Sequence, residues 1–196
     1  GENSIKKDIS FTLEVSNKMG IHERPAAMIV RIASRFEGDN WVEKEENPFM
    51  GFRAIRYCLR NPAIFLDQLR AILRVSSLGK VKIMFPMISG VGELVRAKEF
   101  LFTAKRQLKE RGIEFDDKIE VGCMIETPSA VTICDLLADE VDFFSVGTND
   151  LVQYLLAVDR INNQIAYLYE PHHPAVIRAL SHIFKVSKQK GVEVTL

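Results

Sequence analysis

The sequence predicts an α/β fold: an incomplete (β/α)8, TIM-barrel-like parallel sheet with a shorter β-α-β segment in front of it. From residue 80 onward, short apolar runs alternate with longer segments whose apolar residues follow helical spacing. The short runs are apolar along their whole length, which is typical of parallel strands buried on both faces. The sequence lacks the glycine fingerprints of dinucleotide-binding and P-loop folds. By itself, this alternation also fits a doubly wound sheet.

Length and composition limit the class of protein. The chain has 196 residues, and 26 Lys and Arg residues balance 26 Asp and Glu residues. A formal charge of zero argues against a nucleic-acid-binding surface, which needs a basic excess. The sequence has no apolar run of membrane length and no signal-peptide core, and its three cysteines lack metal-binding spacing. We therefore expect a cytoplasmic protein that neither inserts into membranes nor binds nucleic acid.

The first 45 residues predict a strand, a helix and a second strand. Apolar and polar residues alternate over Asp8–Val15, as in a half-buried strand. A helix is expected from Pro25 to about Phe36, since proline fits the first helical turn. The second strand begins at Trp41–Glu43.

His22 precedes this expected helix. Free N–H groups at a helix N-terminus stabilise a negative charge, and Arg24 is close enough in sequence to contact an anion on the imidazole. A phosphoryl group on the ring would benefit from both. The alternative is an ordinary surface histidine in a loop, because short motifs of this kind often arise by chance.

The next elements follow a loop marked by Pro48 and Gly51. They are two helices, a strand and a third helix, expected in the order 53–60, 62–75, Lys80–Met87 and Val91–Gly112. Arg53 comes soon after the glycine turn, where its guanidinium group is placed like an anion ligand.

The remaining elements continue the alternation. They are a strand, a helix, a strand, a loop, a helix and a strand, expected at Ile119–Ile125, Pro128–Ala138, Val141–Val146, from Gly147 onward, Ala175–Lys190 and Val192–Leu196.

Polar side chains stand where two of these strands end. Glu126 follows one strand directly, Asn149 and Asp150 follow the other, and Arg160 lies downstream. Parallel neighbours bring their carboxyl ends to one edge, so the two carboxylates are expected to converge there. Hard oxygen ligands suit Mg²⁺, and the site is plausible for an anion as well. The alternative is that Glu126 and Asp150 merely cap helices.

The segment MGIHERPAAMIVRIASRF resembles the active-site segment of the histidine phosphocarrier (HPr) family of the bacterial sugar phosphotransferase system. The resemblance covers about residues 5–44 and implies that His22 is the phosphorylated histidine and Arg24 its phosphate partner. It places an HPr-like fragment over residues 1–45, without the second half of an HPr domain.

Four segments resemble the C-terminal phosphoenolpyruvate-binding barrel of the Enzyme I family, the phosphoenolpyruvate–protein phosphotransferases. They are NPFMGFRAIR, KIMFPMIS, GCMIETPSA and VDFFSVGTNDLVQYLLAVDR, and they place a partial barrel over residues 46–196. The resemblance implies Glu126 and Asp150 as Mg²⁺ ligands. It also implies contacts to phosphoenolpyruvate from a second set of residues, namely Arg53, Asn149, Arg160 and Lys82. At the last of these the family usually carries an arginine.

The resemblance implies a component of the phosphoenolpyruvate-dependent sugar phosphotransferase system. Such a protein binds phosphoenolpyruvate and Mg²⁺, relays phosphoryl groups through histidine, and meets other proteins of the system. Parts that the family uses are missing from the sequence: the acceptor-histidine domain, the first barrel strands and a strand-end cysteine. The alternative function is therefore a catalytically incomplete chimera or remnant that acts as a binding module. An open half-barrel also predicts a homodimer, or completion of the sheet by the N-terminal segment.

Overall fold

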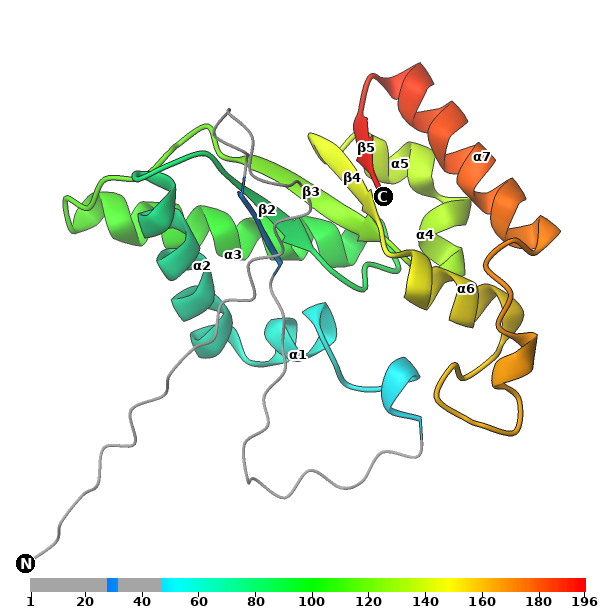
Figure 1. The fold of residues 1–196 in the computed structure, drawn as a ribbon. Helices are drawn as coiled ribbons and strands as arrows, with labels where there is room; N and C mark the ends of the chain where they lie inside the picture. The colour runs from blue at the N-terminus through cyan, green and yellow to red at the C-terminus, as the bar shows by residue number, and fades with distance from the viewer. Residues whose placement is uncertain (1–27, 32–46) are drawn as a thin grey trace, which may run out of the picture.

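A computed structural model of the chain describes residues 28–31 and 47–196 (Figure 1). Its strands are β1 (Met28–Arg31), β2 (Val81–Phe85), β3 (Glu120–Ile125), β4 (Phe143–Val146) and β5 (Glu193–Thr195). The α-helices are α1 (Ile55–Arg60), α2 (Pro62–Ser76), α3 (Val91–Glu110), α4 (Pro128–Thr132), α5 (Cys134–Ala138), α6 (Thr148–Leu156) and α7 (Pro174–Lys190). Two 3-10 helices, η1 (Pro48–Met50) and η2 (Ala166–Leu168), complete the described elements. None of the described helices is both long and apolar enough for a bilayer crossing.

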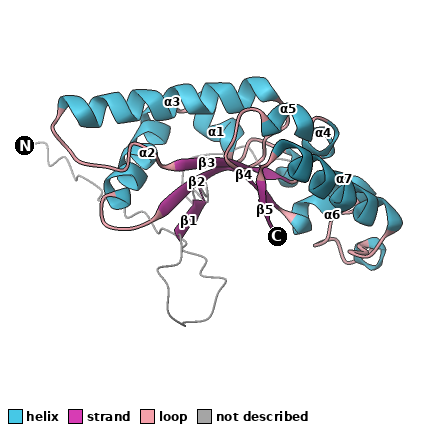
Figure 2. Ribbon diagram, turned by 90° about the horizontal axis from the view of Figure 1, so that it is seen from above, coloured by secondary structure: helices cyan, strands magenta, loops and turns pink. Residues whose placement is uncertain are grey.

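Strand order distinguishes the two expected architectures. The five strands are all parallel and lie in the order β1-β2-β3-β4-β5, which is also their order along the chain. A doubly wound sheet requires a reversal of strand order, whereas a barrel adds each strand beside the last. Figure 2 shows α2, α3 and α5 over one side of the sheet, as in a barrel wall. The fold is therefore of the (β/α)8 type, and the barrel is not closed in the described residues.

Alternate residues of each strand face opposite sides of the sheet. Toward the helices, Ile83, Phe85 and Phe144 are fully or almost fully buried in the main hydrophobic core. On the other face, Met84, Met124 and Phe143 form a second, smaller cluster. Burial of both faces explains why these strands are apolar throughout.

Lys82 shows that the sheet curves toward the side opposite the helices. Its Nζ lies 3.1 Å from a carboxylate oxygen of Glu120 on β3 and 3.1 Å from one of Glu193 on β5, and 5.0 Å from the centre of the Phe143 ring. In a flat sheet, β2 and β5 would be about 14 Å apart. A single lysine reaches across because the strands wrap around it, as they do at the inside of a barrel.

The expected helix from Pro25 to Phe36 is wrong at the residues that the structure describes. Met28–Arg31 forms strand β1, which pairs in parallel with β2 from Met28 opposite Val81 to Arg31 opposite Met84. Two of the four residues, Ile29 and Val30, are β-branched, and their strand supplies the backbone partners that the edge of β2 needs. The other elements expected in the first 45 residues lie outside the described part.

Two further expectations change in the segment from Pro128 to Leu156. The helix expected over Pro128–Ala138 is two short helices, α4 and α5, because Ile133 leaves the helical conformation with φ −110°. The loop expected after Val146 is instead helix α6, which buries Leu151 and Val152. The helical spacing of these apolar residues outweighs the loop character of the Gly147-Thr148-Asn149 start.

The buried cysteines give a test of the core. Burial raises the pKa of the Cys58 thiol from 9.0 to about 12, and it also raises the pKa values of Cys123 and Cys134. Only thiolates react quickly with alkylating agents, so we expect labelling of all three at pH 8 only after unfolding in denaturant. Because the pKa of Cys58 is higher in the folded than in the unfolded protein, the contribution of this thiol to the free energy of unfolding is fully present below pH 9. It is lost as the pH rises from about 9 to 12. Rapid labelling of the native protein, followed by mass spectrometry, would contradict this packing.

Candidate active site

Glu126 joins the carboxyl ends of three strands. It follows the last residue of β3 and is 1% exposed. Its Oε1 accepts a hydrogen bond of 2.6 Å from the backbone N–H of Met87, just beyond β2, and Gly147 N, just beyond β4, donates to Ile125 O at 3.1 Å. Glu126 does not cap the next helix, since Thr127 is the N-cap of α4 and its Oγ1 accepts from Ala130 N. The capping alternative for Glu126 is therefore excluded.

Gly147 lets the backbone approach this carboxylate. A Cβ atom at Gly147 would lie 2.6 Å from Oε2 of Glu126 and 2.8 Å from Sδ of Met124. It would also lie 2.8 Å from Cβ of Glu126, so any residue other than glycine forces Glu126 or Met124 to shift.

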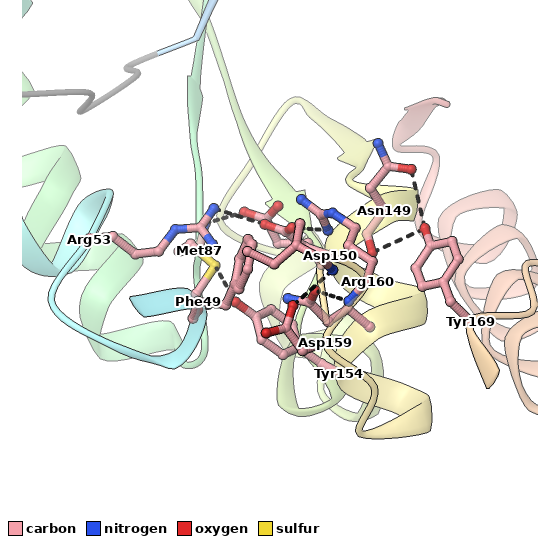
Figure 3. Close-up of polar contacts among 12 residues, drawn as sticks. Phe49, Arg53, Met87, Asn149, Asp150, Tyr154, Asp159, Arg160 and Tyr169 are labelled. Carbon is pink, nitrogen blue, oxygen red and sulfur yellow. Dashed lines mark hydrogen bonds and ion pairs between the residues drawn. The ribbon is translucent and has the colours of Figure 1, made fainter. Parts of the chain in front are cut away.

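Asp150 lies in the first turn of α6 and binds two arginines (Figure 3). Arg53 donates from NH2 to Oδ2 at 2.9 Å, and Arg160 donates from NH1 to Oδ1 at 2.7 Å. The Asp150 side chain is 6% exposed, whereas those of the arginines are 27% and 29% exposed. Asp150 is not an N-cap either, because the N-cap of α6 is Gly147. Its two carboxylate oxygens instead bring together Arg53 and Arg160, which lie 107 residues apart in the sequence.

An aromatic ring supports both arginines. The Cζ atoms of Arg53 and Arg160 lie 5.7 Å and 5.1 Å from the centre of the Phe49 ring, within the range of cation–π attraction. The Tyr154 hydroxyl donates to the backbone oxygen of Phe49 and lies 3.8 Å from Sδ of Met87. Burial is the largest influence on the pKa of Tyr154 and raises it, so this hydroxyl remains a donor at neutral pH.

Asn149 lies beside Asp150 at the exposed rim of the site. The hydroxyl of Tyr169 lies 3.3 Å from Oδ1 of Asn149 and 3.4 Å from its backbone oxygen. Across the site, Gln153 accepts a hydrogen bond from the backbone N–H of Arg160, which fixes the chain as it returns after α6. These contacts tie α6 to Arg160 and Tyr169, both of which lie in the segment after the helix.

Not all of the expected site residues meet. The structure brings Arg53, Asn149, Asp150 and Arg160 together next to the strand-end Glu126. It does not bring Lys82 there, because Lys82 is opposite Glu120 near the amino end of β3, about 20 Å along the strand from Glu126. Burial acts to lower the pKa of Lys82, but its two glutamate partners raise it overall, so the lysine is charged and paired with both of them. His22 and Arg24 lie outside the described residues.

Backbone strain accompanies the site. The described non-glycine residues with positive φ are Ala54 at 53°, Met87 at 56° and Ala157 at 53°. Ala54 follows Arg53, Met87 donates its N–H to Glu126, and Ala157 begins the return toward Arg160. Left-handed conformations cost an ordinary residue of the order of 1–3 kcal/mol and concentrate at functional sites.

The donor set fits a hard divalent cation. Among the described residues, no group of three or more His, Cys, Asp or Glu side chains is arranged to enclose a metal. Two carboxylates, Glu126 and Asp150, nevertheless lie at the same edge of the sheet. Mg²⁺ commonly takes one or two carboxylates and completes its shell with water and substrate oxygens. The residues therefore suit Mg²⁺ better than a metal that needs a full protein cage.

Sequence reasoning did not identify four contributors to this arrangement: Phe49, Met87, Gly147 and Tyr154. The spacing of Asp150 and Tyr154, four residues apart, puts them on one helical face and would have linked them had α6 been expected. The contact of Phe49 with both arginines depends on the tertiary fold, and no local sequence pattern predicts it.

Comparison with known proteins finds one matching family and several relatives of similar sequence. A family described as PEP-utilising enzyme, PEP-binding domain, matches residues 20–196 and so extends into the segment expected to be HPr-like. The chain is 51% identical over 150 residues to the phosphoenolpyruvate-protein phosphotransferase of Priestia megaterium, and 50% identical over 150 residues to that of Bacillus subtilis strain 168. In both cases the match covers 76% of this chain and only 26% of the relative.

A solved structure is similar in fold. A citrate lyase from Burkholderia xenovorans LB400 matches 67% of this chain and 40% of its own chain, with a TM-score of 0.52 and 26% sequence identity. This likeness agrees with the barrel-type arrangement of strands and helices.

The contact between Gly147 and Glu126 can be tested by Gly147→Ala. We expect a loss of about 1–3 kcal/mol in the free energy of unfolding, because the added methyl group must displace Glu126 or Met124. Urea denaturation followed by circular dichroism would measure it.

Gly92→Ala is the matched control. A Cβ there has nothing within 4 Å and lies inside helix α3, so this change should be neutral or stabilise by up to about 1 kcal/mol. Equal effects of the two substitutions would refute the close approach at Gly147.

Proposed function

We propose that this chain, which belongs to the PEP-utilising enzymes, binds phosphoenolpyruvate as part of a phosphoenolpyruvate–protein phosphotransferase. The family match supports the substrate class, and the identity to the phosphotransferases supports the reaction. Because the chain spans about a quarter of the length of these relatives, the reaction is proposed for the protein of which such a domain is a part.

One observation carries the proposal: two guanidinium groups from distant segments meet on Asp150 beside a buried carboxylate. Phosphoenolpyruvate carries a phosphate and a carboxylate, and arginine presents paired N–H donors that match both groups. In the proposed complex Arg53 and Arg160 bind these anionic groups, and Asn149, at the rim, adds an amide donor. Phe49 keeps the arginines over the site.

Glu126 and Asp150 are the proposed holders of Mg²⁺. When bound, the metal would supply neutralisation of charge on the transferring phosphoryl group. Glu126 is suited to this role because the N–H of Met87 orients its carboxylate, and Asp150 because α6 fixes its position. The burial of Asp150 lowers the local dielectric on its side of the site and strengthens its electrostatic contacts.

The phosphoryl relay is the second part of the proposal. By the resemblance of its segment, His22 is the histidine that carries phosphate, with Arg24 as its partner. Other proteins of the sugar phosphotransferase system are the proposed partners, in the cytoplasm, and a homodimer is the proposed assembly.

Calorimetry with phosphoenolpyruvate and Mg²⁺, together with an assay for acid-labile phosphate on His22, tests both parts. Phosphoenolpyruvate is expected to bind much more tightly when Mg²⁺ is present than when it is absent. Absence of binding and of phosphohistidine would reject the function.

Arg160→Lys tests the anion contact. Lysine keeps the positive charge and loses the forked pair of donors, so phosphoenolpyruvate binding with Mg²⁺ should weaken by roughly 1.5–3 kcal/mol, or about 10- to 150-fold. Titration calorimetry measures the change. Arg106→Lys, at an exposed pair with Glu110 on α3, is the control and should leave the affinity unaltered. Equal affinities for Arg160→Lys and the control would rule out a direct role for Arg160.

A further inference from the structure

Asp150 has two roles that conflict. As a proposed metal ligand it must offer its oxygens to a cation, yet in the structure both oxygens are occupied by the arginines that would bind the substrate. We propose that Asp150 is an internal substitute for the substrate anion, so that metal on Asp150 and phosphoenolpyruvate on the arginines promote each other's binding. This inference rests on the proposed function and adds how the two ligands are coupled.

The geometry shows that the arginines are engaged rather than free. Arg53 and Arg160 approach different oxygens of one carboxylate at 2.9 Å and 2.7 Å. Asp150 is almost entirely shielded from water, so solvent screens these bridges less than it would on an open surface. The N–H groups that point at Asp150 are not available to a phosphate, and an incoming anion would also meet the negative charge of Asp150.

A cation on Asp150 removes both obstacles. It neutralises the carboxylate, and its charge repels the two guanidinium groups from the aspartate oxygens. The released groups still rest on Phe49, 5.7 Å and 5.1 Å from the ring centre, so they remain at the site as donors for an anion. The same linkage acts in reverse, because an anion that takes the arginines leaves Asp150 free for a cation.

An opposite role for Asp150 makes a different prediction. If the aspartate only holds the arginines in their binding pose, then removing its charge disorders them and weakens anion binding. If it competes with the substrate, removing its charge strengthens anion binding in the absence of metal. The sign of the change therefore separates the two roles.

Asp150→Asn in the full chain provides the test. Asparagine keeps the size of the side chain and one oxygen acceptor but lacks the charge. With a chelator present and no metal, calorimetry should find phosphoenolpyruvate bound about 5- to 150-fold more tightly by the variant than by the wild type. Mg²⁺ should then add much less affinity to the variant. Unchanged or weaker metal-free binding by a folded variant would overturn the proposal.

Asp139→Asn is the matched control, since it removes one negative charge from an exposed pair with Lys190, away from the two arginines. This variant should bind phosphoenolpyruvate without metal as the wild type does. An equal gain in affinity would show that the effect comes from net charge, and it would refute competition between Asp150 and the substrate.

A measurement on the wild type tests the coupling even if the Asp150→Asn variant does not fold. Mg²⁺ alone should shift the arginine side-chain Nε–Hε signals of Arg53 and Arg160 in nuclear magnetic resonance spectra, and signals that stay fixed at saturating Mg²⁺ would contradict the coupling. If the wild type does not bind phosphoenolpyruvate even with Mg²⁺, the proposed function fails. If it binds but Asp150→Asn gains no metal-free affinity, only the coupling fails.

Discussion

The contact of Asp150 with Arg53 and Arg160 holds together parts of the chain that have little else in common. Arg53 comes from the turn between η1 and α1, where Phe52 before it is 47% exposed and Ala54 and Ile55 after it are buried in the core. Arg160 comes from the loop after α6. The two ion pairs, the ring of Phe49 and the hydroxyl of Tyr154 act together with this burial to place the segment against the sheet. The site is shaped by the same charges that are proposed to bind its ligands.

The two ends of the sheet show a division of labour that is typical of barrels. At the amino ends of the strands, Lys82 is enclosed by Glu120, Glu193 and the Phe143 ring. At the carboxyl ends, Asp150 is held by arginines whose side chains are more than a quarter exposed. In both clusters a largely buried charge is paired with more exposed partners, and the side chains of Glu120 and Glu193 are 40% and 62% exposed. The first lies where the sheet curves, and the second is the one proposed to bind ligands.

Much of this arrangement could be predicted from sequence. Continuous apolar runs predicted parallel strands, and the strand ends predicted that Glu126 and Asp150 would share an edge, because parallel register leaves few other possibilities. Lys82 shows the limit of that reasoning, since its place near the start of β2 sends it to the opposite end of the sheet. Met28–Arg31 shows another limit. Its apolar residues have helical spacing, but the segment forms a strand that pairs with β2. Contacts such as Phe49 with two arginines depend on the whole fold, and no local pattern encodes them.

The positive φ angles at Ala54, Met87 and Ala157 have a consequence for protein engineering. A programme that raised thermal stability by relieving backbone strain would replace such residues with glycine, and Ala157, with φ 53° and ψ 40°, would be an obvious choice. Yet glycine also widens the range of conformations open to the chain, at the place where it turns back toward Arg160. Thermal stability and a fixed position for Arg160, the proposed ligand contact, are therefore opposing design goals at this turn. Directed evolution at Ala157 should select for both at once.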